Sequence, residues 1–298
     1  MTKPVLGFCG IGLMGAPMAR RLLQAGYRVQ IWNRSLEKAQ ALQDAGAEIA
    51  ASPAALAQTC QTIFLCLTDE NAVEATVFGD QGIHRAPGAL LVDHSSISPT
   101  ATKDFAARLF KASGHAWVDA PVSGGAASAN AGTLTIMAGG PADAVARATP
   151  LMQAYAAQIT HMGDTGAGQV AKLCNQTIVA ASINAIAEAV ALAQHNGIDA
   201  AGLSTALAGG WADSTLLQIF VPRMVTQVNQ PLGSVATMLK DLNNVAALAD
   251  GTGTSLRVLT AVRQSFQLAV EQGLAQADLS EIVRVPWPEK PTTTTETL

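Results

Sequence analysis

Short apolar runs alternate with helical periodicity in the first half of the chain, and the second half carries helical periodicity alone. Val5–Cys9, Thr62–Leu67 and Ala89–Val92 are continuous apolar runs with the length of strands buried on both faces. From Val170 to Ala193 apolar residues recur at helical spacing over a stretch long enough to join two domains. The pattern predicts an α/β domain with a parallel sheet, followed by an all-helical domain.

The remaining elements follow from the same spacing and from turn residues. Further strands are expected at Tyr27–Trp32, Glu48–Ala50, Ala116–Asp119, Thr133–Ala138 and Gln158–His161. Further helices are expected at Ala16–Ala25, Ser35–Ala45, after Ser52 and Pro53, from the capping run at Thr68–Asn71 to Phe78, and at Ser98–Lys111, Pro141–Tyr155, Ala200–Leu207, Ser214–Val225, Ser234–Leu248, Thr254–Glu271 and Leu279–Val285. A long loop of small residues is expected between Ala120 and Gly132.

Composition narrows the class of protein. Hydrophobic residues make up 49% of the chain and charged residues 13%, so a large core is available. A net charge of −4 argues against non-specific nucleic-acid binding, which needs a basic surface. We expect no signal peptide and no membrane span. Cys9, Cys60, Cys66 and Cys174 lack metal-ligand spacing and are expected to be reduced core thiols of a cytoplasmic protein.

A glycine turn joins the first strand to the first helix. Gly10, Gly12 and Gly15 have the spacing of a dinucleotide fingerprint in its required strand–turn–helix context. The first glycine permits a tight turn, the second lets a pyrophosphate approach the backbone, and the third lets the helix pack closely. The N-terminus of the helix attracts phosphate. We therefore expect a Rossmann-type, doubly wound sheet whose cofactor contacts include Gly10, Ile11, Gly12, Leu13, Met14 and Gly15.

The second strand ends in Asn33-Arg34-Ser35 and carries no carboxylate there. A site specific for NAD usually has Asp or Glu at this place to bind the ribose 2′-hydroxyl. Arg34 offers a fork of donors that suits a 2′-phosphate. The residues favour NADP over NAD; the alternative is that Arg34 is a solvated turn residue and Ser35 only an N-cap.

Polar residues follow later strands at the edge of the sheet where ligands bind in doubly wound folds. Leu67, Thr68, Asn71 and Ser96 are candidates for the cofactor wall, although each polar one also suits a cap or turn.

The loop Ser123-Gly124-Gly125 places a hydroxyl beside bare backbone N–H groups, which suits a carboxylate. Without further support such a loop is only a turn.

The stretch Gly166–Gln176 marks the change from mixed to helical pattern. Lys172, Asn175 and Gln176 stand at i, i+3 and i+4, which is one face of a helix. Taken alone, Lys172 is more simply an exposed helical lysine.

Four motifs in the order of the chain resemble the β-hydroxyacid dehydrogenase family, which includes 3-hydroxyisobutyrate dehydrogenase and tartronate semialdehyde reductase. They are Gly7–Ala19, Asp119–Gly125 with Gly132–Thr135, Gly166–Asn175, and Leu239–Leu242. The resemblance extends from Val5 to about Val283. It implies an NAD(P)-dependent enzyme that interconverts a small β-hydroxyacid and its semialdehyde and that forms dimers or tetramers.

The resemblance also implies roles for single residues. Lys172 corresponds to the catalytic lysine, Asn175 to a substrate-orienting amide, and Ser123 with Gly124 to the carboxylate anchor. Lys240 corresponds to a lysine that contacts the cofactor and borders the substrate site. Two positions depart from the family pattern, because Ser96 replaces a common threonine and Thr68 a common proline.

The predicted organisation is an NADP-binding domain at 1–163, a helical substrate and oligomerisation domain at 164–285, and a disordered polar tail at 286–298. No metal is expected. The alternatives that remain are a non-catalytic dinucleotide-binding module and an imine reductase of similar architecture, which usually replaces the lysine.

Overall fold

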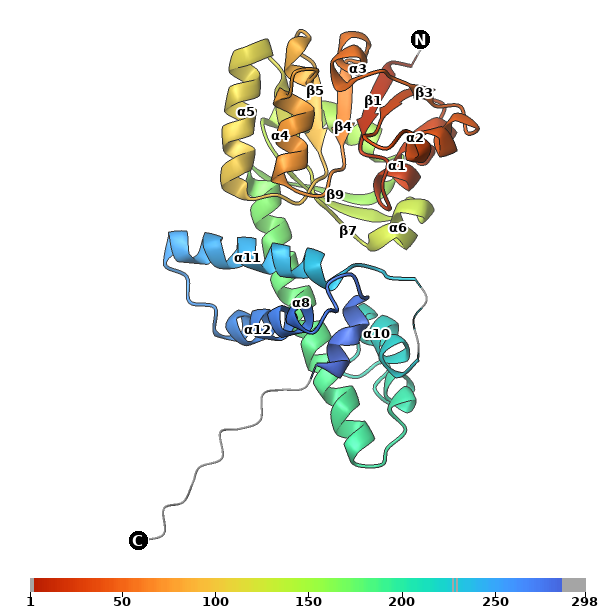
Figure 1. Cartoon of the computed structure of the whole chain (residues 1–298), viewed down its shortest axis with the longest axis vertical. Helices are drawn as coiled ribbons and strands as arrows, with labels where there is room; N and C mark the ends of the chain where they lie inside the picture. The colour runs from red at the N-terminus through yellow and green to blue at the C-terminus, as the bar shows by residue number, and fades with distance from the viewer. Residues whose placement is uncertain (1–2, 227, 229, 286–298) are drawn as a thin grey trace. The chain divides into compact units, whose positions relative to one another are not determined.

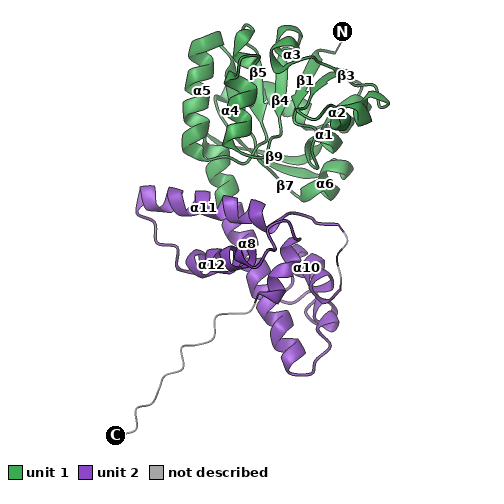
Figure 2. Cartoon of the chain, viewed as in Figure 1, with its two compact units in different colours: residues 1–174 green, residues 175–298 purple. Residues whose placement is uncertain are grey.

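The computed structural model describes residues 3–226, 228 and 230–285. The chain divides into two compact units, Met1–Cys174 and Asn175–Leu298 (Figure 2). The division falls inside one helix, α8 (Ala167–His195). The tail predicted at 286–298 lies outside the described residues, and the functional assignment of 1–163 and 164–285 remains a prediction.

One sheet holds the strands of the first unit. Its order is β3-β2-β1-β4-β5-β6-β8-β7, and β9 pairs with β8. The pairs from β3 through β6 are all parallel, whereas β8 is antiparallel to β6 and β7. The order reverses between β1 and β4, as in a doubly wound fold. The strands are β1 (Val5–Cys9), β2 (Arg28–Trp32), β3 (Glu48–Ile49), β4 (Thr62–Leu65), β5 (Leu90–Asp93), β6 (Ala116–Asp119), β7 (Val122–Ser123), β8 (Leu134–Gly139) and β9 (Ala156–Gly163).

Helices cover both faces of this sheet (Figure 1). Met18, Leu22 and Leu42 fill one buried cluster, whereas Leu56 and Val73 belong to the cluster on the opposite face. Because both faces are covered, the central strands are apolar without alternation. The helices are α1 (Gly15–Gln24), α2 (Leu36–Gln43), α3 (Pro53–Thr59), α4 (Glu70–Phe78), the 3₁₀ turn η1 (Ile83–Arg85), α5 (Pro99–Ser113), α6 (Gly125–Ala131) and α7 (Ala142–Met152).

The prediction of a loop between Ala120 and Gly132 is wrong, because strand β7 and helix α6 form there. Alanine has the highest intrinsic helix propensity, and Gly132 ends α6 in the left-handed region at φ 76°. Gly124 and Gly125 lie at the N-terminus of α6.

The second unit is helical, as the periodicity predicts. After the rest of α8 come η2 (Ala200–Gly202), α9 (Leu203–Ala206), α10 (Thr215–Val225), α11 (Val235–Thr252), α12 (Arg257–Glu271) and η3 (Leu279–Arg284). Ser214 and Ser234 cap α10 and α11 through their hydroxyl oxygens. The buried Asp278 pairs with Arg223 at 3.0 Å and also accepts from the backbone N–H of Leu232.

Within the described residues α8 has the length and apolar composition of a membrane-crossing helix, and 44% of its most apolar window is buried. Gln169, Lys172 and Gln176 are buried polar side chains on this helix, and each donates a hydrogen bond to another part of the protein. Such bonds are those of a helix built into a protein core.

Three of the four cysteines agree with the expectation of core thiols and one does not. Cys9 and Cys60 are buried and Cys66 is half-buried, but Cys174 is exposed on α8. All four are free thiols.

Candidate active site

Three glycines shape the turn between β1 and α1, for two different reasons. Gly10 has φ 99°, and a Cβ there would lie 2.3 Å from the carbonyl oxygen of Cys66. A Cβ on Gly15 would lie 1.9 Å from the carbonyl oxygen of Gly10. Both positions therefore exclude any side chain because of the protein's own backbone.

Gly12 differs, because a Cβ there would meet no atom of the described chain within 4 Å. The protein itself has no steric need for glycine at this position. The start of α1 carries no acidic residue in its first turn and no side-chain cap. Open space above a backbone turn beside a helix N-terminus fits a dinucleotide pyrophosphate.

Asn33 ties the end of β2 to this turn. Its Oδ1 accepts the backbone N–H of Ile11 at 2.9 Å, and its Nδ2 donates to the carbonyl of Ser35 at 2.9 Å. Ser35 begins α2 without a side-chain cap bond. The neighbouring Arg34 is exposed, and it forms no ion pair with any carboxylate that the structure describes.

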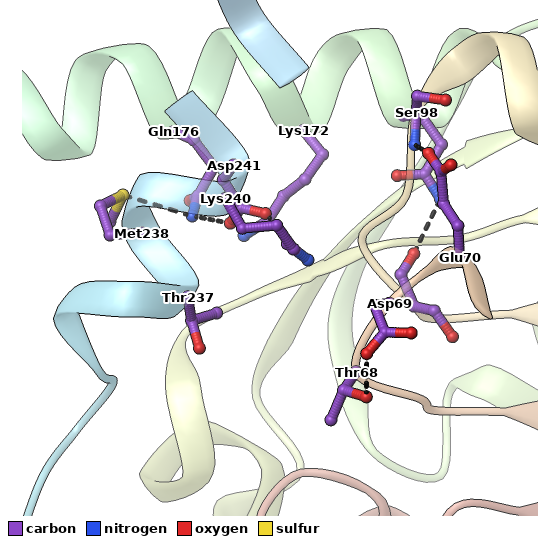
Figure 3. A network of polar contacts seen from close by, with 12 residues as sticks. Thr68, Asp69, Glu70, Ser98, Lys172, Gln176, Thr237, Met238, Lys240 and Asp241 are labelled. Carbon is purple, nitrogen blue, oxygen red and sulfur yellow. Dashed lines mark hydrogen bonds and ion pairs between the residues drawn. The ribbon is translucent and has the colours of Figure 1, made fainter. Parts of the chain in front are cut away.

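The ends of β4 and β5 lie next to the turn. The backbone N–H of Cys66 donates to the carbonyl of Cys9 at 2.9 Å, and that of Leu67 donates to the Ser95 hydroxyl at 2.9 Å. Thr68 donates to Asp69, whose other oxygen caps α4 (Figure 3). Asn71 is exposed in the first turn of α4, and Ser96 is half-buried after β5. Contact of these residues with the cofactor remains a prediction.

Two buried acids end the neighbouring strands β5 and β6. Asp93 and Asp119 are register partners with no exposed surface. Oδ1 of Asp93 accepts from the backbone N–H of Ser95 at 2.9 Å, whereas Oδ2 has no partner among the described atoms. Burial, with a smaller contribution from the charge of Asp119, raises the pKa of Asp93 to about 7.

His94, between them in sequence, is a buried structural residue. Its Nδ1 lies 2.6 Å from the carbonyl oxygen of Ala120 and its Nε2 lies 2.9 Å from the Tyr155 hydroxyl. Burial lowers the pKa of His94 to about 4, so the ring is neutral at pH 7.

Asp119 holds the first turn of α8. Its Oδ1 accepts the backbone N–H of Gly166 at 2.8 Å and its Oδ2 that of Gln169 at 3.0 Å. Burial raises the pKa of Asp119, and these backbone donors act against that rise. A Cβ on Gly168 would lie 2.4 Å from the carbonyl oxygen of Met137, so the glycine lets the helix start lie directly against the sheet.

Lys172 lies one turn further along α8. Its side chain is 9% exposed, and Nζ donates to the carbonyl oxygen of Val122 at 2.9 Å. Val122 precedes Ser123 in β7, and Gly124 and Gly125 follow with φ of 121° and 67°. The structure thus brings the lysine to the segment that carries the expected carboxylate anchor.

The other expected site residues belong to the second unit. Asn175 donates to Gln176 at 2.9 Å, and Gln176 donates to Asp241 at 2.7 Å. The other oxygen of Asp241 forms an ion pair with Lys240 at 3.2 Å (Figure 3). The bond from Gln176 to Asp241 links α8 to α11, and the same carboxylate pairs with the Lys240 ammonium.

Sequence reasoning assigned no role to Asp119 or Gln169. The available signal was a buried strand that ends in Asp, together with a helix that starts at glycine and alanine without a capping side chain of its own. No group of three His, Cys, Asp or Glu side chains within the described residues could hold a metal ion.

The sheet, its switch point and the glycine turn define a dinucleotide-binding fold of the Rossmann type. Residues 5–163 match the family model described as the NAD binding domain of 6-phosphogluconate dehydrogenase. Residues 166–286 match the model described as NAD-binding of NADP-dependent 3-hydroxyisobutyrate dehydrogenase.

Similarity to known proteins extends over almost the whole chain. It is 35% identical to 2-hydroxy-3-oxopropionate reductase of Escherichia coli, with 94% of this chain and 96% of the relative covered. It is also 35% identical to NAD-dependent L-serine dehydrogenase of Pseudomonas aeruginosa, with 94% and 97% covered. A 3-hydroxyisobutyrate dehydrogenase structure from Salmonella typhimurium superposes with a TM-score of 0.88 at 28% identity, with 95% and 100% covered. The chain belongs to the β-hydroxyacid dehydrogenase family, which confirms the resemblance seen in the sequence.

Proposed function

We propose that the protein interconverts a small β-hydroxyacid and its semialdehyde with NADP, and that Lys172 is the general acid and base. The supporting observation is the position of Lys172, a nearly buried cation whose Nζ is bonded to Val122, next to Ser123. A lysine ammonium is a cationic N–H donor, the kind of group that stabilises and protonates a substrate oxygen.

Reduction of an aldehyde develops negative charge on the carbonyl oxygen. The nicotinamide supplies the hydride to the carbonyl carbon, and a cation within hydrogen-bond reach stabilises the oxygen and gives it a proton. In our proposal Lys172 does both, and solvent then reprotonates the amine. Ser123, Gly124 and Gly125 hold the substrate carboxylate through a hydroxyl and backbone N–H groups. Asn175 orients the substrate, and Lys240 lies at the border of the cofactor.

The test is Lys172→Met, which keeps most of the apolar stem and removes the charge. We expect kcat to fall about 10²–10⁴-fold, as for loss of a general acid, while NADPH binding is retained. Lys111→Met makes the same change at an exposed lysine of α5 and should leave kcat unchanged. Near-normal turnover of Lys172→Met with intact binding of NADPH would disprove the catalytic role.

Preference for NADP over NAD is the second part of the proposal. Arg34 is exposed, and Ser35 has a hydroxyl that is not used as a helix cap. Both are suited to a 2′-phosphate at the end of β2. Arg34→Gln should lower kcat/KM for NADPH about tenfold, the equivalent of about 1.4 kcal/mol, and leave kcat/KM for NADH nearly unchanged. Equal loss with both cofactors would assign Arg34 to the shared part of the dinucleotide.

The substrate class is tested with a panel of glyoxylate, 2-hydroxy-3-oxopropionate and succinic semialdehyde with NADPH, and 3-hydroxyisobutyrate and serine with NADP. Turnover of at least one panel member is expected. The two relatives named above act on 2-hydroxy-3-oxopropionate and L-serine. Reduction of cyclic imines but not of these aldehydes would favour an imine reductase. Cofactor binding without any turnover would favour a non-catalytic module.

Self-association to a dimer or tetramer in the cytoplasm completes the proposal. A groove of about 1160 Å³ lies within the second unit between α8, α12 and η3, and its lining includes Leu192, Leu268 and Ile282. Leu192, on α8, is 67% exposed. Light scattering on the purified chain tests the assembly, where a monomer at all concentrations would refute it; cell fractionation tests the location, where recovery in the membrane fraction would refute it.

A further inference from the structure

The short segment between β6 and Ser123 is held at each backbone carbonyl. The carbonyl oxygen of Ala120 lies 2.6 Å from Nδ1 of His94, that of Pro121 accepts from the backbone N–H of Met137 at 3.2 Å, and that of Val122 accepts from Lys172. The segment is therefore a fixed support for the residues that follow it.

The residue just before this segment, Asp119 at the end of β6, anchors α8. Asp119 accepts two backbone N–H groups from the first turn of the helix, with no exposed surface of its own. Gln169, in that first turn, donates from Nε2 to the carbonyl oxygen of Ser95 at 2.8 Å and is 1% exposed. The helix start is thus tied to the ends of both β5 and β6.

These contacts decide where the lysine lies. Gln169 and Lys172 are three residues apart, which is less than one turn of a rigid helix, so a shift of the first turn moves Nζ by a similar amount. The carbonyl oxygen of Val122 accepts the hydrogen bond from Lys172. Val122 lies on this supporting segment, three residues after Asp119. One short piece of chain therefore holds both the helix start and the lysine head.

We propose that Asp119 is a positioning residue that sets Lys172 at the Val122–Ser123 segment through the first turn of α8, with Gln169 as its second tether. The inference rests on the proposed catalytic role of Lys172 and deepens it. Asp119 does not touch the reacting atoms; it acts through the lysine. A carboxylate suits this place because only an acceptor on both oxygens satisfies two N–H groups at once.

The test is a double-mutant cycle on the full-length protein, with Asp119→Asn and Lys172→Met, measured by single-turnover NADPH oxidation with glyoxylate and succinic semialdehyde. Asn keeps the volume but presents an N–H₂ to one of the two backbone donors. Asp119→Asn alone should lower the single-turnover rate constant about 10²-fold, as misplacement by about 1 Å does, with the Kd for NADPH unchanged. In the Lys172→Met background the same change should lower the residual rate by less than about twofold.

Three outcomes separate the two proposals. If Lys172→Met is itself nearly as active as the wild type, the catalytic role of the lysine is wrong. If Lys172→Met is strongly impaired but Asp119→Asn still lowers its residual rate about 10²-fold, the effects are additive and the positioning role is wrong. If the two changes together are no worse than Lys172→Met alone, the positioning role is supported.

Ser52→Ala is the control for the effect of losing a helix cap elsewhere in the protein. It removes the hydroxyl that accepts the backbone N–H of Ala55 at the start of α3. This variant should lower Tm and leave kcat unchanged. Should Asp119→Asn fail to fold, Gln169→Met enters the same cycle, because it removes only the tether to Ser95. An unchanged kcat in folded Gln169→Met would then overturn the inference.

Discussion

The two glycine motifs of the first unit use the same residue for opposite purposes. At the turn after β1, Gly12 faces open space, and no described atom would clash with a side chain at this position. At the start of α8, a Cβ on Gly168 would lie 2.4 Å from the carbonyl oxygen of Met137 and 2.7 Å from that of Asp119. The first glycine leaves room for a ligand, whereas the second lets two parts of the protein touch.

The groups that hold the two motifs differ as well. In the turn after β1, the neutral amide of Asn33 accepts a hydrogen bond from the backbone N–H of Ile11. A buried carboxylate, Asp119, accepts the N–H groups of Gly166 and Gln169 at the second. The first motif should therefore respond to cofactor concentration, and the second to changes in packing and in the ionisation of the buried acids.

Among the substitutions that test this comparison, Gly168→Ala should have the largest effect. The new methyl group meets backbone atoms that cannot rotate away, so the helix start must move from the sheet. We expect the free energy of unfolding to fall by about 1–3 kcal/mol from overpacking, and kcat to fall about 10²-fold as Lys172 shifts. Chemical denaturation and steady-state kinetics measure the two effects.

The matched control for this substitution is Gly251→Ala in α11, where a Cβ meets no described atom within 4 Å. It should leave kcat unchanged and stabilise the helix slightly. Wild-type activity and stability in Gly168→Ala would show that the close approach at the start of α8 is not required.

Gly12→Ala should affect the cofactor and spare the fold. Its φ lies outside the left-handed region and the space around it is open, so the free energy of unfolding should change by less than about 0.5 kcal/mol. A methyl group that takes the room of the pyrophosphate should raise the Kd for NADPH about tenfold, or about 1.4 kcal/mol. Titration calorimetry measures this Kd. If both NADPH affinity and stability stay at the wild-type value, the open space above Gly12 is not the cofactor seat.

Asp93→Asn should change the pH dependence of stability with little effect on kcat. Burial raises the pKa of Asp93 from 3.8 to about 7, so the folded state keeps a proton that the unfolded state loses above about pH 4. The stability from protonated Asp93 is complete below that pH and is lost as pH rises through about 7. Relative to the wild type, Asn should gain stability with a slope of up to about 1.4 kcal/mol per pH unit in this window and then level off.

Denaturant unfolding of both proteins between pH 4 and pH 8 measures that difference. His94, whose pKa is lowered to about 4, is present in both chains, so its own pH dependence cancels in the comparison. A constant difference across the range would show that Asp93 is ionised throughout, with a pKa near its usual value.

Local signals were enough for most of the sheet and its helices. Ser52-Pro53 and Ser98-Pro99 do begin α3 and α5, and both serines accept the expected backbone N–H. Cap and proline rules act over three or four residues, so they can be applied without knowledge of the fold. The prediction failed at α6, where the glycines of Ser123–Gly125 obscured the helix propensity of the alanines that follow.

Some residues of the candidate site could be selected from the sequence, and others only from the structure. The motifs selected Lys172 and Ser123 as a pair, since they match a family pattern. Asp119 was visible in the same motif without a role, because its partners are the backbone N–H groups of Gly166 and Gln169, which no residue type reveals. Exposure of Cys174 was missed because an apolar neighbourhood in sequence does not tell which side of α8 faces solvent.

By itself the sequence determined the class of fold and the glycine turn, because periodicity, capping and residue spacing are properties of neighbouring positions. Lys172 was selected as the catalytic candidate by the resemblance of its motif to a known family. Only the tertiary structure decided why each glycine is a glycine and what holds the helix of Lys172. The sequence alone does not distinguish the role of Gly12 from that of Gly168. The open space at the first and the carbonyl of Met137 at the second come from strands that the chain brings together only when it folds.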